Sequence, residues 1–66
     1  MSTQEYFTLL QSKYGRMLLS KSETANEIGI SEATLDRLRK QNAIRSKKVG
    51  GKVFFTIANV ADYIAA

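Results

Sequence analysis

The stretch that decides the fold is SKSETANEIGISEATLDRLRKQN, residues 20–42. Ser20 and Glu23 have the S-x-x-E spacing of a capping box, in which a hydroxyl and a carboxylate each bond a backbone N–H at the start of a helix. The helix that begins there is expected to run for only about two turns, because Gly29 supplies a tight turn that a residue with a Cβ resists. The first half of the stretch therefore predicts a short helix and a sharp turn.

The second half of the stretch predicts another short helix, with Ser31 as its N-terminal cap. A helical wheel groups four residues on the face expected to be buried: Ser31, Leu35, Leu38 and Asn42. The same wheel turns another group outward, with further residues at its borders: Ala33, Asp36, Arg37 and Lys40, bordered by Glu32, Thr34 and Gln41. Two short helices joined by a glycine-centred turn are typical of a helix-turn-helix unit.

An additional helix is predicted upstream, over residues 3–14. Ser2 and Glu5 form a second capping-box pattern, and Gly15 stands where a left-handed residue would end the helix. Four apolar or aromatic residues share one stripe of this helix: Tyr6, Phe7, Leu10 and Tyr14. We expect the stripe to pack on the core of the same chain, the alternative being a homodimer or partner contact. Residues 16–19 are interpreted as a short apolar approach to the next helix.

Downstream of the stretch the hydrophobic period changes. Residues 45–49 and 52–55 flank Gly50 and Gly51, which predicts a β-hairpin because a two-residue loop requires positive φ angles. Thr56 is the expected cap of a last helix whose apolar residues recur at helical spacing: Ile57, Val60, Ala61 and Ile64. The predicted fold class is mainly α with a small β-hairpin: a winged helix-turn-helix with a three-helix core plus an N-terminal helix.

The composition limits the function. The 66 residues allow one small domain, and the absence of Cys and His excludes disulfides, zinc fingers, thiol nucleophiles and imidazole catalysis. We therefore expect no enzyme, no metal and no cofactor. The net charge is +4, and residues 37–52 carry seven basic side chains and no acidic one. Such a segment favours a polyanionic partner, a phosphate backbone above all, although a merely solubilising face is the alternative.

The run LLSKSETANEIGISEATLDRLRKQNAIRSKKVGGKVFFTIANVADYIA, residues 18–65, resembles the compact winged helix-turn-helix domain of phage excisionases and AlpA-type regulators, which is related in fold to the DNA-binding head of MerR. Its most specific parts are IGISEATLDRLRKQNAI and VGGKVFFTIANVADYI. The resemblance implies a DNA-binding domain over residues 18–66 and leaves residues 1–17 as a helical extension. It also implies that a helix at about residues 32–41 enters the major groove, while the wing, residues 45–55, reaches the backbone or minor groove.

The expected DNA contacts come from this helix, its cap and the wing: Ser31, Ala33, Thr34, Arg37, Arg39, Lys40, Lys47, Lys48 and Lys52. Arg37 is the first choice for a base contact, because its planar fork can bond guanine O6 and N7 together. Ser31 and Thr34 are placed to bond a phosphate, although Ser31 is better explained as a cap alone. The other cations are expected to clamp the backbone, the alternatives being base contacts by Arg39 and Lys40 and, for the lysines of the wing, protection of an edge strand. Glu32 and Asp36 are expected to pair with Lys40 and similar neighbours, the alternative being contact with cytosine N4.

These features predict a sequence-specific double-stranded DNA-binding protein of a mobile element, acting as an excisionase, a transcriptional regulator or both. An integrase or RNA polymerase is the expected protein partner, with cooperative or dimeric binding on DNA, and the expected location is the cytoplasm, on the nucleoid, without a membrane span. The alternative is a helix-turn-helix scaffold that binds an acidic protein through Tyr6, Phe7 and Tyr14. Binding of nucleic acid without sequence preference is a third hypothesis.

Overall fold

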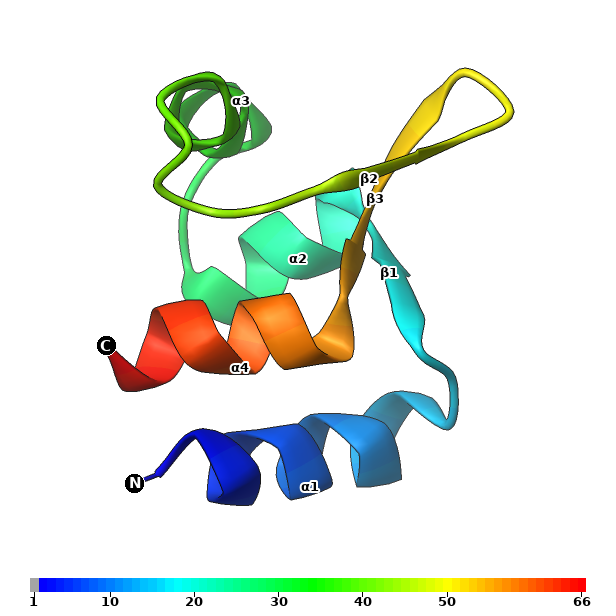
Figure 1. Cartoon of the computed structure of the whole chain (residues 1–66), viewed down its shortest axis with the longest axis vertical. Coiled ribbons are helices and arrows are strands. Elements are labelled where there is room, and N and C mark those ends of the chain that lie inside the picture. The colour runs from blue at the N-terminus through cyan, green and yellow to red at the C-terminus, as the bar shows by residue number, and fades with distance from the viewer. Residues whose placement is uncertain (1) are drawn as a thin grey trace.

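The computed structural model describes residues 2–66 and arranges them as four helices and a three-stranded antiparallel sheet (Figure 1). The chain is mainly helical. The helices are α1 (Thr3–Tyr14), α2 (Lys21–Ile28), α3 (Glu32–Lys40) and α4 (Ile57–Ala65). The strands are β1 (Leu18–Ser20), β2 (Lys47–Val49) and β3 (Lys52–Thr56).

The helix starts follow the capping signals of the sequence. Ser2 with Glu5, and Ser20 with Glu23, form complete capping boxes at the starts of α1 and α2. Ser31 and Thr56 cap α3 and α4 through their side-chain oxygens. All four predicted helices are therefore confirmed, together with their N-terminal caps.

The predicted hairpin is part of a larger sheet. β3 pairs with β2 on one side and with β1 on the other, so the strand order is β1-β3-β2. The interpretation of residues 16–19 as a mere approach was wrong, because Leu18–Ser20 forms a strand that sets Leu19 opposite Phe55. Both of these side chains are fully buried, and each such burial contributes about 1.5–3 kcal/mol. That burial keeps this short segment on the sheet.

The connection between β2 and β3 agrees with its prediction. Gly50 and Gly51 have φ angles of 58° and 82°, the left-handed values that a tight two-residue turn requires. The strands differ slightly from expectation, because β2 begins at Lys47 rather than at Arg45 and β3 extends to Thr56. The hairpin is therefore shorter on its first strand than on its second.

The buried face of α3 differs from its prediction. Leu35 is fully buried and Leu38 is partly buried, as expected, but Ser31 and Asn42 are exposed. Ser31 is the cap and has an extended backbone, so its side chain turns to the helix end instead of the core. Asn42 lies beyond the end of the helix with a left-handed φ of 59°. Extending the helical wheel to these two positions was wrong because neither has a helical backbone.

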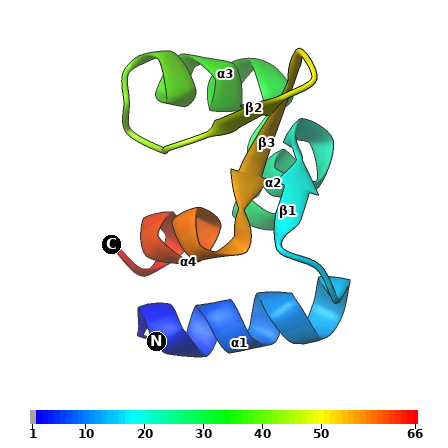
Figure 2. The ribbon, with the colours of Figure 1, turned by 45° about the vertical axis from the view of Figure 1, so that its right-hand side comes forward.

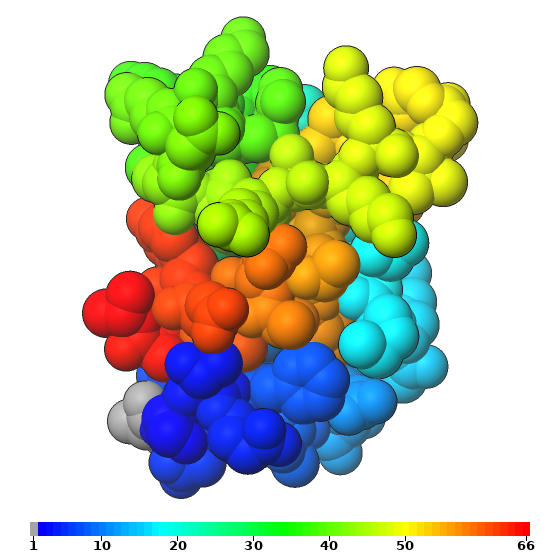
Figure 3. Space-filling model, in the orientation of Figure 1, coloured from blue at the N-terminus to red at the C-terminus, as the bar shows by residue number. Residues whose placement is uncertain are grey.

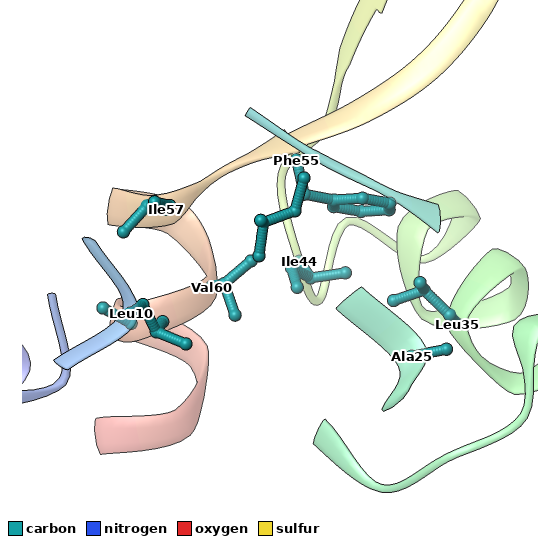
Figure 4. Close-up of a cluster of buried hydrophobic side chains, with 9 residues drawn as sticks. Leu10, Ala25, Leu35, Ile44, Phe55, Ile57 and Val60 are labelled. Atoms are coloured by element: carbon teal, nitrogen blue, oxygen red, sulfur yellow. The ribbon is translucent and has the colours of Figure 1, made fainter. Parts of the chain in front are cut away.

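One hydrophobic core joins all four helices and the sheet. Its buried members are Leu10, Leu19, Ala25, Leu35, Ile44, Phe55, Ile57, Val60 and Ala61. Figure 4 shows these side chains extending from Leu10 on α1, through Val60 on α4 and Ile44, to Leu35 on α3. α1 packs against α4, and its aromatic stripe (Tyr6, Phe7 and Tyr14) is packed against this core. Packing of the stripe within the same chain is thus confirmed.

The elements are stacked along the long axis of the molecule. α1 and α4 run antiparallel at one end, and α3 and the turn of the β2–β3 hairpin lie at the other, as Figures 1 and 2 both show. α2 and the sheet lie between these layers. The start of α1 and the end of α4 lie at the same edge of the molecule, away from the tip of the hairpin.

Candidate functional site

Ion pairs divide the basic residues of the chain into two groups. Four of the ten Lys and Arg residues pair with a carboxylate: Lys13 with Glu27, Arg16 with Glu23, and both Lys21 and Arg39 with Asp36. The other six have no ion-pair partner among residues 2–66: Arg37, Lys40, Arg45, Lys47, Lys48 and Lys52. We call these six residues the unpaired cations. All of them fall within residues 37–52, the segment that carries seven basic side chains and no acidic one.

The unpaired cations lie on α3, on the β2–β3 hairpin and, for Arg45, on the segment between them. Arg37 and Lys40 are exposed on α3, and the hairpin carries Lys47, Lys48 and Lys52, which are also exposed. α3 and the hairpin tip form the same end of the molecule, and Figure 3 shows the surface hollowed between them. Exposed cations without an ion-pair partner among residues 2–66 are therefore present on both elements that flank this hollow.

The smaller predicted contacts on α3 lie at its N-terminal end. The Oγ of Ser31 accepts the backbone N–H of Thr34 at 3.1 Å, and its hydroxyl donates to Thr34 Oγ1 at 3.0 Å. Ser31 is therefore engaged as a helix cap, which was the preferred explanation of this residue. Ala33 is exposed, and Thr34 is partly buried. Neither Ala33 nor Thr34 carries a charge, so neither adds to the positive charge of α3.

Arg39 differs from the other basic residues of α3 because it is turned toward Asp36. Its Nε and Nη2 donate to Asp36 Oδ1 at 3.4 and 3.3 Å, while Lys21 Nζ on α2 donates to Oδ2 at 3.0 Å. The hydrogen bond from Lys21, assisted by Arg39, holds the pKa of Asp36 below its ordinary value despite partial desolvation. Pairing of Asp36 with a neighbouring cation was predicted and is found with Arg39, while Lys21 of α2 is a second partner that was not expected. The expected pairing of Glu32, and that of Asp36 with Lys40, was wrong, because neither Glu32 nor Lys40 has an ion pair among residues 2–66.

A second charged cluster, which sequence reasoning missed, ties α1 to α2. Tyr14 Oη donates to Glu27 Oε1 at 2.7 Å, and the same oxygen accepts from Lys13. Lys13 Nζ and Arg16 Cζ lie 5.5 and 5.8 Å from the centroid of the Tyr14 ring, within cation–π range. Burial, reinforced by the bond to Glu27, raises the pKa of Tyr14 to about 12. The cluster joins residues that are 13 or 14 positions apart in the chain. A helical or capping pattern, which spans only three or four residues, therefore cannot predict it.

Two further properties concern the described part of the chain as a whole. Over residues 2–66, every helix is too short or too polar to cross a membrane. Within the same residues, His, Cys, Asp and Glu side chains nowhere gather in a group of three that could hold a metal ion.

No family model, curated protein or solved structure matches this chain. The resemblance of residues 18–65 to the excisionase and AlpA-type domain thus rests on the motifs quoted above. The geometry of the α3 and hairpin end is an independent observation.

Proposed function

We propose that the protein binds double-stranded DNA as a winged helix-turn-helix domain, with α2 and α3 as the helix-turn-helix and the β2–β3 hairpin as the wing. One observation carries this proposal: all six unpaired cations lie on α3, on the hairpin or on the segment between them. Concentrated charge of one sign is costly unless a polyanion neutralises it and releases counterions. Duplex DNA is the polyanion whose groove admits a helix.

The dimensions of α3 suit the major groove. An α-helix with its side chains is about 10–12 Å in diameter, and the major groove of B-DNA is about 12 Å wide. Arg37, exposed on this helix, is the residue we assign to a base contact, since a bidentate bond to guanine gives about 1–3 kcal/mol of discrimination. The hairpin lysines would contact the phosphate backbone. A flexible ammonium group can bind a phosphate whatever the base sequence is.

The biological role follows from the resemblance of residues 18–65. We propose a sequence-specific DNA-binding protein of a mobile element that acts as an excisionase, a transcriptional regulator or both. A single recognition helix of nine residues reads few base pairs. Useful specificity therefore requires several copies on adjacent sites, with an integrase or RNA polymerase as the protein that the assembled complex engages.

The test is a titration of a labelled pool of random duplexes at about 50 and 200 mM salt, followed by sequencing of the bound fraction. Six phosphate contacts would give a slope of log K against log salt of about −5, which corresponds to a loss of roughly 10³-fold across this range. An enriched sequence that disappears in Arg37→Ala supports base recognition. Lys13→Ala, which removes a paired cation from α1, is the control and is expected to leave the slope unchanged.

Two outcomes count against the proposal. Absence of binding at about 50 mM salt would refute it, because the electrostatic attraction is strongest there. Salt-sensitive binding without an enriched sequence would reduce it to binding without sequence preference. The alternative of a protein-interaction module has less support, because Tyr6, Phe7 and Tyr14 pack against the core of their own chain. It predicts loss of activity in Tyr14→Ala and none in Arg37→Glu.

A further inference from the structure

Asp36 lies between two cations that come from different helices. Lys21, the first residue of α2, reaches one carboxylate oxygen at 3.0 Å, and Arg39, in the last turn of α3, reaches the other at 3.3 and 3.4 Å. The exposed fractions of the three side chains are 31% for Lys21, 33% for Asp36 and 24% for Arg39. The cluster is therefore held by its contacts and still partly exposed to solvent.

The arrangement is one that also binds phosphate. Arg and Lys hydrogen-bond a phosphate oxygen in the same way as a carboxylate oxygen, through short charge-assisted bonds. Two cations held together around one anion retain a net charge of +1 while Asp36 is ionised and would have +2 without it. Asp36 is on α3 itself, the helix that the proposed function places against DNA.

We propose that Lys21 and Arg39 form a phosphate-binding site that the carboxylate of Asp36 occupies, so that Asp36 competes with the DNA backbone for these two cations. This inference rests on the proposed function, because it concerns α2 and α3, the helices assigned to the helix-turn-helix. Asp36 thereby limits the sequence-independent part of the affinity, which depends on the number of phosphates neutralised. The six unpaired cations can bind phosphates without first breaking an ion pair. Lys21 and Arg39 can bind phosphates only when Asp36 releases them.

Asp36→Asn tests the competition, because it removes the charge and keeps the size of the side chain. Glu32→Gln is the matched control: it removes the same charge from the same helix, but Glu32 has no ion pair among residues 2–66. Affinity for a random duplex is measured at several salt concentrations between about 50 and 200 mM. Thermal unfolding of both variants verifies that they are folded.

We expect Asp36→Asn to steepen the salt slope by about 1 to 2, since each added phosphate contact contributes roughly 0.9. Its affinity at about 50 mM salt should rise tenfold or more, whereas Glu32→Gln should keep the wild-type slope. Adding Lys21→Ala to Asp36→Asn should remove about half of the change in slope. Equal slopes for Asp36→Asn and Glu32→Gln would overturn the inference and leave the proposed function intact.

A second measurement needs no DNA. It distinguishes failure of the proposed phosphate site from failure of the proposed DNA-binding function. In nuclear magnetic resonance titrations with inorganic phosphate, the side-chain signals of Lys21 and Arg39 should shift in Asp36→Asn and stay in place in the wild type. If the wild type fails to bind DNA but these shifts occur, the proposed function fails and the phosphate site stands. If the shifts of Lys21 and Arg39 are missing in Asp36→Asn, the phosphate site is refuted independently of the proposed function.

Discussion

Thr24 offers a way to increase the stability of the protein by removing a polar group. Its side chain is fully buried in α2, and among the described residues its Oγ1 has no hydrogen-bond partner. A buried hydroxyl without a partner costs about 1–3 kcal/mol, because it has lost its bonds to water. Thr24→Val replaces the hydroxyl by a methyl group of similar size and keeps a β-branched side chain, so the helix propensity hardly changes.

The expected gain is about 1 kcal/mol or more in the free energy of unfolding. For a domain of this size, 1 kcal/mol corresponds to a rise of about 4–8 °C in Tm. The total stability of 66 residues is on the order of 3–10 kcal/mol. One substitution would thus change a considerable part of the whole.

The assay is urea unfolding followed by far-ultraviolet circular dichroism, in which the midpoint should increase while the denaturant slope stays constant. Thr24→Ser is the control, since it retains the hydroxyl and deletes the methyl group. It should lose about 0.5–1.5 kcal/mol, as small core truncations do. A Thr24→Val protein less stable than the wild type would refute the reasoning, because it would mean that the hydroxyl has a favourable partner.

Other predictions concern the α1–α2 cluster and the hairpin turn. Hydrogen bonds from Lys13 and Tyr14 lower the pKa of Glu27, so its contribution to stability is present at neutral pH and is lost as the pH falls below about 4.5 and through its folded-state pKa. Acid titrations of unfolding should show a weaker pH dependence in Glu27→Gln, and identical curves would contradict the assignment. The pKa of Tyr14 is raised from 10.0 to about 12, so stability from its hydroxyl is complete below pH 10 and declines between pH 10 and about 12. The free energy of urea unfolding of Tyr14→Phe, measured across this pH range, should lack this decline, and a decline equal to that of the wild type would refute the role of the hydroxyl. Gly51→Ala should cost about 1–2 kcal/mol because an L-residue resists the φ of 82°, and an unchanged thermal midpoint would show that the turn adapts.

The sequence predicted the elements whose signals are local. Capping boxes and glycines specify helix ends within three or four residues, which is why the start of every helix agrees with expectation. β1 was missed because three residues are too few to display an alternating pattern. Its existence depends on β3, a partner far away in the chain, through the pairing of Leu19 with Phe55.

The candidate site, too, could be predicted only where its signals are local in the sequence. The basic segment is visible in the sequence, but which of its cations are free is decided by tertiary contacts. Arg39 is paired through an i,i+3 contact that a wheel can anticipate, whereas Lys21 and Asp36 are 15 residues apart and meet only because α2 packs beside α3. Counting charges in the sequence therefore identified the basic segment, residues 37–52, but overestimated how many of its cations have no ion-pair partner, because Arg39 is paired.

The position of the start of α1 and the end of α4 has a practical consequence. Because the start of α1 and the end of α4 lie at one edge, away from the hairpin tip, copies joined in tandem by a flexible linker would each keep α3 and the hairpin accessible. Within such a fusion, the second copy experiences an effective concentration in the millimolar range, set by the length of the linker. Fusions of one, two and three copies would count how many domains a DNA site requires, without any change to the binding surface itself.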